Sequence, residues 1–223
     1  GTGDKAVKIG GENVFPLYSF DAAIENAPKV GIEITDFGME HEPECIKKYY
    51  EGCATLADMA RKAASMEGED FLSFRMEGGD PNGANKSTEE LIGELKEIAD
   101  AVDLPLVVCG CKNVEKDAEL FSKAAEALNG KNAVILSAKE ENYKTVGAAA
   151  GLAYKQVVGA ESAVDINLAK QLNVLISQLG VDSKSVVMNV GTAAVGYGFE
   201  YVISTMDRVK AAALQQGDAN LQM

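Results

Sequence analysis

Residues 106–118 read Leu-Val-Val-Cys-Gly-Cys-Lys-Asn-Val-Glu-Lys-Asp-Ala, and this stretch contains the strand, the loop and the helix start of one repeating unit of the fold. Its beginning is apolar and rich in valine, which is typical of a short buried strand. A polar turn follows, and Asn113 is a suitable N-cap for a helix. Apolar side chains then recur at helical spacing as far as Leu128. The stretch therefore predicts a strand, a loop and a helix in succession.

The same alternation repeats along the chain, where short β-branched runs are each followed by a turn and a segment of helical period. This order indicates an α/β fold in which parallel strands are joined by helical crossovers. Six strands are predicted, at residues 30–34, 71–74, 106–109, 133–136, 162–165 and 186–188.

The helices between these strands have their own start and stop signals. Ser87-Thr-Glu-Glu90 has the pattern of a capping box and precedes an amphipathic segment. A second apolar stripe runs from Ile166 to Leu179, and Gly180 is placed to end that helix. Other helices are predicted after Tyr49, Asn113, Glu140 and Phe199.

Two architectures fit such a pattern, an open doubly wound sheet and a closed (β/α)8 barrel. No strand is followed by the glycine fingerprint of a dinucleotide or nucleoside-triphosphate fold, which favours the TIM-type barrel. Six strand–helix units are too few to close it, because such barrels typically need about 250 residues. We therefore expect residues 1–223 to form a single barrel domain that is incomplete at its C-terminus.

Composition limits the classes of partner. The 223 residues carry 34 acidic and 21 basic side chains, for a net charge of −13, which argues against a nucleic-acid or anionic-membrane surface. No apolar run approaches the roughly 20 residues of a membrane span, and the N-terminus has no signal-peptide organisation. The sequence thus predicts a cytoplasmic protein with small-molecule or protein partners.

The sequence contains few residues that are suited to metal binding or to acid–base catalysis. The four cysteines do not have the spacing of a common zinc or iron–sulfur site, so reduced, structural thiols are expected. The one histidine, His41, lies in a Glu-His-Glu-Pro stretch that is typical of a solvated turn. We expect no catalytic residue and no metal ligand in this chain.

The loops after the strands are the candidate working surface, because ligands of parallel α/β folds bind at the carboxyl ends of the strands. These loops are rich in amides, hydroxyls and glycines, which suits a ligand bearing carboxamides and carbonyls. The most glycine-rich loop is Gly191-Thr-Ala-Ala-Val-Gly-Tyr-Gly198, whose small residues let backbone approach a large ligand or a protein surface.

Several motifs in and beside these loops form a specific combination. They are residues 10–16 (Gly-Gly-Glu-Asn-Val-Phe-Pro), 79–83 (Gly-Asp-Pro-Asn-Gly), 105–110, 113–117, 141–144, 165–173 (Asp-Ile-Asn-Leu-Ala-Lys-Gln-Leu-Asn), 196–201 (Gly-Tyr-Gly-Phe-Glu-Tyr) and 206–208. In these motifs the sequence resembles a known family, the small (delta) subunit of the corrinoid iron–sulfur protein of the CO dehydrogenase/acetyl-CoA synthase complex. The resemblance covers nearly the whole chain.

The resemblance implies a (β/α)8 barrel that forms a heterodimer with a large subunit carrying a corrinoid and a [4Fe-4S] cluster, with no cluster on this chain. It implies that the assembly takes a methyl group from methyltetrahydrofolate, through a methyltransferase, to acetyl-CoA synthase. The barrel mouth would cap the corrinoid. The residues that would contact it are Asp80, Asn82, Asn113, Ser137, Asn142, Asn167, Asn189, Gly191, Thr192, Gly196 and Gly198.

The chain also departs from the family pattern. Asn189 stands after the sixth strand, where relatives usually have an Asp-Pro pair, and residues 109–113 read Cys-Gly-Cys-Lys-Asn where a Gly-Cys-Gly type is usual. Two alternatives therefore stay open. One is a pterin-binding barrel methyltransferase acting on methyltetrahydrofolate, which would use Asp80, Asp165, Asn167 and Asn189. The other is a purely structural interaction subunit that touches no cofactor.

Overall fold

The computed structural model describes residues 1–10 and 24–222 of the chain. Residues 11–16 of the motif at residues 10–16 lie outside the described part. Six strands form one parallel sheet in the order β1-β2-β3-β4-β5-β6. The strands are β1 (Gly31–Thr35), β2 (Phe71–Arg75), β3 (Leu106–Cys109), β4 (Val134–Ala138), β5 (Val157–Glu161) and β6 (Val186–Asn189).

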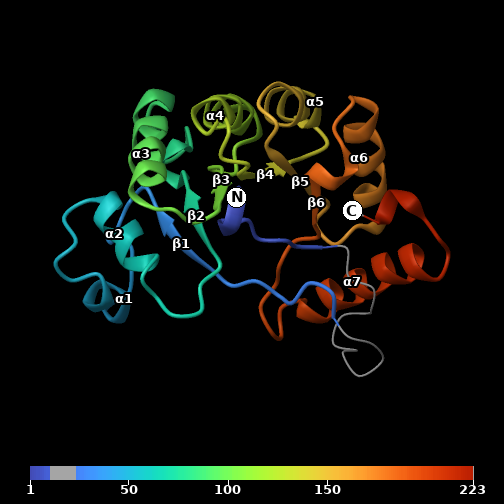
Figure 1. Ribbon diagram of the computed structural model, residues 1–223, viewed down its shortest axis with the longest axis horizontal. Coiled ribbons are helices and arrows are strands. Elements are labelled where there is room, and N and C mark those ends of the chain that lie inside the picture. The colour runs from blue at the N-terminus through green and yellow to red at the C-terminus, as the bar shows by residue number, and fades with distance from the viewer. Residues whose placement is uncertain (11–23, 223) are drawn as a thin grey trace.

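Helices follow the strands along the chain, and those between Thr88 and Gln178 lie in a row along one side of the sheet (Figure 1). None of those within the described residues is long and apolar enough to cross a membrane. The helices are α1 (Glu44–Tyr49), α2 (Leu56–Ala63), α3 (Thr88–Ala101), α4 (Val114–Ala127), α5 (Tyr143–Val146) with its π-helical continuation Gly147–Ala153, α6 (Ile166–Gln178) and α7 (Phe199–Leu214).

The strand order excludes one of the two predicted architectures. A doubly wound sheet reverses its strand order at a switch point, whereas here each strand pairs with the next one in the sequence. Such unbroken order is typical of consecutive units of a (β/α) barrel. The described sheet is open, with β1 and β6 at its two edges, so closure into an eight-stranded barrel stays a prediction.

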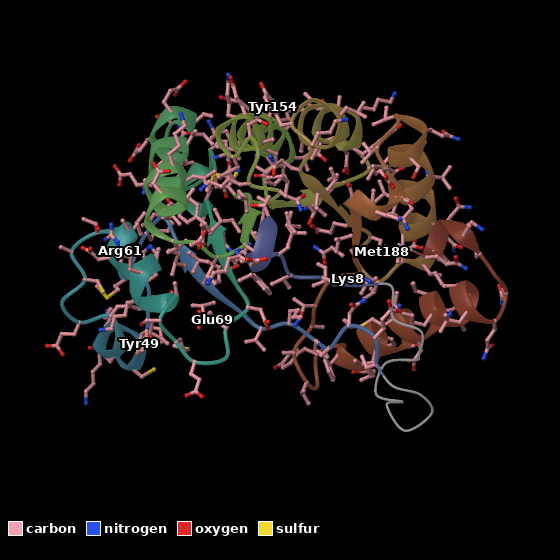
Figure 2. The ribbon with its side chains drawn as sticks, viewed as in Figure 1. Lys8, Tyr49, Arg61, Glu69, Tyr154 and Met188 are labelled. Carbon is pink, nitrogen blue, oxygen red and sulfur yellow. The ribbon has the colours of Figure 1, made fainter. Side chains whose placement is uncertain are left out.

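The two faces of the sheet differ in burial. Side chains such as Phe74, Val108 and Ile135 point toward the helices and are fully buried in the main core. The alternate positions face the other way, and some of them, such as Val107 and Val157, are only half-buried. Figure 2 shows Tyr154 on the helix side and Lys8 and Glu69 on the opposite, more open side.

Five of the six predicted strands are confirmed to within two residues at either end. The fifth prediction, at residues 162–165, is wrong, because the strand is β5 and the predicted residues form the turn after it. Gly159 weakened the strand signal, and its lack of a side chain leaves room for Leu136 of β4, since a Cβ would lie 2.2 Å from Leu136 Cδ2. Ala163 and Val164 have positive φ and cannot continue a strand.

The helix signals are largely confirmed. Ser87 accepts a hydrogen bond from the Glu90 amide and Asn113 accepts one from the Lys116 amide, as N-caps do. The complete capping box is at Thr55 and Asp58. Gly180, with φ of 102°, lies just past the end of α6.

One buried amide ties the helix layer to the sheet. Gln156, directly before β5, is fully buried. Its Oε1 accepts from the backbone amide of Ala133, at 2.6 Å, and its Nε2 donates to the carbonyls of Leu128 and Tyr154, both at 3.0 Å. The side chain thus satisfies backbone groups at the end of α4 and beside β4.

We expect Gln156→Leu to lower the free energy of unfolding by about 3 kcal/mol, because buried backbone groups would lose their partners. Urea denaturation measures this. Gln178→Leu, at an exposed position in α6, is the matched control and should change stability by less than about 0.5 kcal/mol. Equal stability of the two variants would contradict this role of Gln156.

Candidate functional site

The candidate site is a cavity of about 230 Å³ at the carboxyl ends of β2 to β6, which we call the mouth cavity. Parallel pairing brings these strand ends to one edge of the sheet, where ligands of such folds bind. Its polar lining residues are Arg75, Lys112, Asp117, Ser137, Lys139, Glu161 and Asn189.

At the β2 side, an ion pair holds the wall of the mouth cavity. Arg75 donates two hydrogen bonds to the Glu33 carboxylate of β1, at 2.9 and 2.8 Å. This bond raises the pKa of the Arg75 guanidinium. Ser73 Oγ bonds the same carboxylate at 3.3 Å and lies 3.6 Å from Cys109 Sγ. The charge of Arg75 is therefore already matched by a carboxylate.

At the opposite side, a hydrogen bond joins β4 to β6. Asn189 Nδ2 donates to Ser137 Oγ at 2.9 Å, and Asn189 Oδ1 accepts from the Gly191 amide at 3.0 Å. Leu136 and Ser137 both line the cavity although they are adjacent, because the pairing register shifts between Ile135 and Ala138. Such a bulge re-aims a side chain.

A second ion pair crosses the same wall. Lys139 Nζ lies 3.5 Å from Glu161 Oε1, with both side chains about 30% exposed. Two cations of the mouth cavity, Arg75 and Lys139, therefore face carboxylates, and the third, Lys112, is exposed to solvent.

The remaining carboxylate belongs to Asp117, in the first turn of α4. It is buried and accepts a hydrogen bond from the Cys111 amide at 2.7 Å. Burial raises the pKa of the Asp117 carboxyl, and the backbone hydrogen bond from Cys111 opposes that shift. Gly110 permits this approach, since a Cβ there would lie 2.2 Å from Asp117 Oδ1.

The two thiols at this end of the sheet are both buried. Burial raises the pKa of Cys109, and it raises the pKa of Cys111 to about 11. They are neutral thiols at neutral pH, and hence weak nucleophiles and metal ligands. Within residues 1–10 and 24–222, no group of three or more His, Cys, Asp or Glu side chains is arranged to hold a metal. His41 is exposed and its ring stacks edge-on against Phe37.

Of the residues that the sequence analysis nominated, the mouth cavity brings together Ser137 and Asn189, with Gly191 bonded beside them. Asn113 and Asn142 are used inside the fold. Asn113 caps α4, and Asn142 accepts from the Lys139 amide at 2.7 Å.

The other nominated polar residues lie outside the cavity lining. Asp80 accepts from the Asn82 amide at 2.9 Å in a turn after β2, and Asn167 is exposed on the first turn of α6. Asp165 is the N-cap of that helix. The four residues considered for pterin binding, Asp80, Asp165, Asn167 and Asn189, are thus not gathered in this cavity.

Thr192, Gly196 and Gly198 belong to the loop of residues 191–198, which presents exposed apolar side chains. Val195 is 83% and Tyr197 87% exposed, and Tyr201 on the first turn of α7 is 65% exposed. We call the surface formed by Val164, Val195, Tyr197, Phe199 and Tyr201 the apolar loop surface.

Hydrogen bonds hold this surface against the β5–α6 turn. Val164, at φ of 61°, donates its amide to the Val190 carbonyl at 2.8 Å and accepts from Thr205 Oγ1 of α7 at 3.2 Å. A valine rarely adopts this conformation, so its neighbours must fix it.

Sequence reasoning missed Arg75, Asp117, Lys139 and Glu161. Arg75 and Glu161 are the last residues of their strands. Arg75 is paired with Cys109 and Glu161 with Asn189, so their side chains lie on the same face of the sheet as those two cavity residues. The alternation of side chains along the predicted strand could therefore have placed Arg75 at the site. The same alternation could not place Glu161, because the fifth strand was predicted at the wrong residues.

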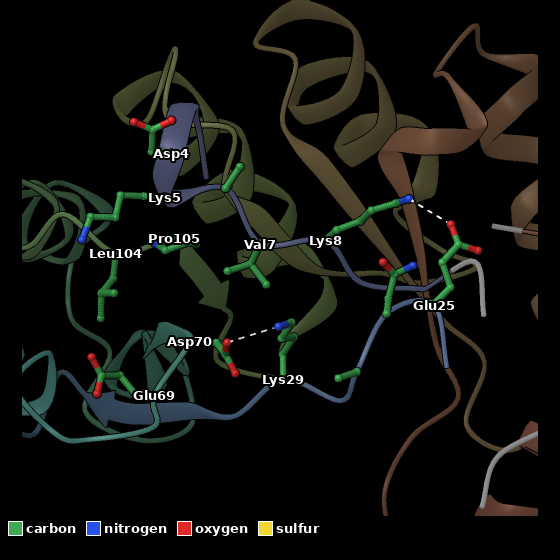
Figure 3. A pocket seen from close by; sticks show the side chains of 13 residues that line it. Asp4, Lys5, Val7, Lys8, Glu25, Lys29, Glu69, Asp70, Leu104 and Pro105 are labelled. Carbon is green, nitrogen blue, oxygen red and sulfur yellow. Dashed lines mark hydrogen bonds and ion pairs between the residues drawn. The ribbon is translucent and has the colours of Figure 1, made fainter. Parts of the chain in front are cut away.

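A larger cavity, of about 560 Å³, lies at the other end of the sheet (Figure 3). Residues 4–8 and 25–29 form its walls beside Asp70 and Pro105, which precede β2 and β3. Ion pairs join Lys8 to Glu25 and Lys29 to Asp70 across it. Because ligands bind at the carboxyl ends of parallel strands, we assign the functional site to the smaller cavity.

Comparison with known proteins identifies the relatives of the chain. The family model described as CO dehydrogenase/acetyl-CoA synthase delta subunit matches residues 1–223. The chain is 34% identical to acetyl-CoA decarbonylase/synthase complex subunit delta of Methanothermobacter thermautotrophicus, over 98% of this chain and 56% of that protein. The same subunit of Methanopyrus kandleri is 33% identical, over 100% and 55%. That of Archaeoglobus fulgidus is 31% identical, over 99% and 49%.

These matches confirm the family resemblance drawn from the motifs. The chain spans about half the length of the curated relatives it matches.

The buried Asp117 gives the site a measurable pH dependence. Because its pKa is raised in the folded state, folded protein binds the proton more tightly than unfolded protein. Stability from this group is present at low pH and is lost as pH rises from the ordinary aspartate pKa through the raised one. We expect wild type to lose stability relative to Asp117→Asn across that window and to run parallel to it above.

Urea denaturation at a series of pH values measures the difference, and NMR titration of the Asp117 side-chain carboxyl carbon locates the raised pKa. A difference that stays constant with pH, or grows in favour of wild type as pH rises, would refute the assignment.

Proposed function

The chain belongs to the CO dehydrogenase/acetyl-CoA synthase delta subunit family, and from this premise we propose that it is the small subunit of a corrinoid iron–sulfur methyl carrier. Its mouth cavity and apolar loop surface cap a corrinoid held by a large subunit that also carries a [4Fe-4S] cluster. The carrier passes a methyl group from methyltetrahydrofolate, through a methyltransferase, to acetyl-CoA synthase in the cytoplasm.

The observation that carries the proposal is the chemistry of the mouth cavity. Its Arg75 and Lys139 face carboxylates, its Lys112 is exposed to solvent, its thiols are neutral, and amide and hydroxyl groups lie among them. Such a lining binds and orients a polar, uncharged surface and supplies no strong base or nucleophile. This suits a subunit that shelters a cofactor better than one that performs the transfer.

These residues fit a corrinoid, whose rim carries carboxamide groups. Asn189, Ser137 and Lys139 would offer donors to that rim, and Glu161 would offer an acceptor. The corrinoid, when bound, supplies a cobalt centre that carries the methyl group. The part of this chain is to exclude water from one face of the cofactor and to fix its orientation.

The apolar loop surface extends the same role outward. Tyrosine and phenylalanine side chains at 43% to 87% exposure are costly to leave in water and are typical anchors of a protein interface. Their position beside the mouth cavity supports a large subunit that seats on the loop and presents its cofactor to the cavity.

Co-purification tests the proposal. We expect the isolated chain to be colourless and free of iron, and to acquire a corrinoid absorption band only in complex with the large subunit. A stoichiometric iron–sulfur chromophore on the isolated chain would contradict the proposal. Binding of methyltetrahydrofolate to the isolated chain by calorimetry would favour the pterin-binding alternative, and a stable complex without corrinoid would favour a purely structural subunit.

We expect Tyr197→Ser to weaken association with the large subunit by about fivefold or more, because an exposed aromatic anchor is lost. Its stability should change by less than about 0.5 kcal/mol. Biolayer interferometry measures the affinity. Met66→Ser, at a 41% exposed position after α2, is the control. Unchanged affinity in the Tyr197 variant would remove the loop from the interface.

A further inference from the structure

The mouth cavity is too small to hold a whole cofactor. Its volume of about 230 Å³ is below the roughly 300–1,000 Å³ of sites that enclose a complete small-molecule ligand. A macrocycle can only lie across its opening. What enters the cavity is then a single side arm of a larger ligand.

The lining around Ser137 and Asn189 disfavours an ionic arm. Arg75 is bonded to Glu33 by two hydrogen bonds, and Lys139 is paired with Glu161. Lys112, the other cation of the lining, is exposed to solvent. A carboxylate placed beside Ser137 and Asn189 would lie against Glu161, and an ammonium group there would lie against Lys139. Either would compete with the ion pair that these two side chains already form.

The lining still offers unused hydrogen-bonding groups. Ser137 Oγ accepts from Asn189 and donates to no acceptor in the described part of the chain, so its proton is available. Asn189 Nδ2 keeps a second proton, and Glu161 keeps the oxygen that does not face Lys139. A donor and an acceptor therefore line the same small cavity.

We propose that the mouth cavity binds one primary carboxamide arm, with its carbonyl accepting from Ser137 and Asn189 and its amino group donating to Glu161. This rests on the proposed function, in which the arm belongs to the rim of the corrinoid. A carboxamide is neutral and presents one acceptor and one donor edge, which matches the lining.

Selectivity follows from this geometry. A corrinoid in which that arm is a free acid would place a carboxylate against the Glu161 carboxylate. Glu161 would then lack the amino group that donates a hydrogen bond to it. A site built to bond both edges of an amide rejects the analogue that lacks one of them. The chain would thereby select fully amidated corrinoids over their partly hydrolysed forms.

The test uses the complex of this chain with its large subunit, reconstituted with cobinamide, in which every arm tested is an amide. Parallel samples receive monocarboxylic acids in which one propionamide has been hydrolysed. Corrinoid retained after gel filtration is measured by visible absorption, and dissociation constants by titration. We expect wild type to bind cobinamide at least about tenfold more tightly than at least one monoacid.

Glu161→Gln should reduce that ratio to within about threefold, because glutamine can donate to a carboxylate. Ser137→Ala should weaken cobinamide binding about fivefold, since it removes the donor to the carbonyl. The matched controls are Glu141→Gln, an exposed glutamate in the loop after β4, and Ser183→Ala, an exposed serine before β6. Both should behave as wild type. Thermal melts of each variant establish that it is folded.

A wild-type complex that binds cobinamide and every monoacid equally would overturn the inference and leave the proposed function standing. So would a Glu161→Gln variant that is folded and keeps the wild-type ratio. A complex that retains no corrinoid of any kind would overturn the inference and the proposed function together.

Discussion

The structure depends on the unbroken parallel pairing of β1 to β6, with one face of the sheet buried under the helices. Each strand must place its alternate residues in the core, so the register of the whole sheet is fixed by side chains such as Phe74 and Ile135. That register also determines the other face. Arg75 is the register partner of Cys109, and Glu161 is the register partner of Asn189, so these side chains lie next to each other on that face. The mouth cavity is therefore a consequence of how the core packs.

The polar side chains of the mouth cavity are held in place by one another. Arg75 is bonded to Glu33, Lys139 lies against Glu161, and Asn189 joins Ser137 to the Gly191 amide. Such mutual satisfaction keeps half-buried charges from destabilising the fold. It also leaves few groups free, which supports the proposal that the site recognises neutral polar groups.

The sequence was sufficient for the α/β alternation of strands and helices and for most helix limits, because these follow from local periodicity and caps such as Asn113 and Gly180. It failed at β5, where Gly159 leaves room for the side chain of Leu136, a long-range contact that no local pattern contains. The same limit applies to the site. Asn113 and Asn142 looked like ligand contacts, but their amides bond neighbouring backbone, while Arg75 and Lys139 reach the cavity through pairing between strands distant in sequence.

The apolar loop surface and the mouth cavity are fixed relative to each other by the β5–α6 turn. Val164 has the unfavourable conformation of that turn, and it is held there by the Val190 carbonyl and by Thr205 of α7. Asn189 bonds the start of the adjoining loop and also lines the cavity. Because these bonds exist before any partner binds, less order has to be created on association, and the cost of binding falls accordingly. The local strain at Val164 is thus explained as part of a preorganised rim. In the proposed function, the exposed aromatic side chains of this rim would supply affinity, and the polar cavity beside them would supply selection.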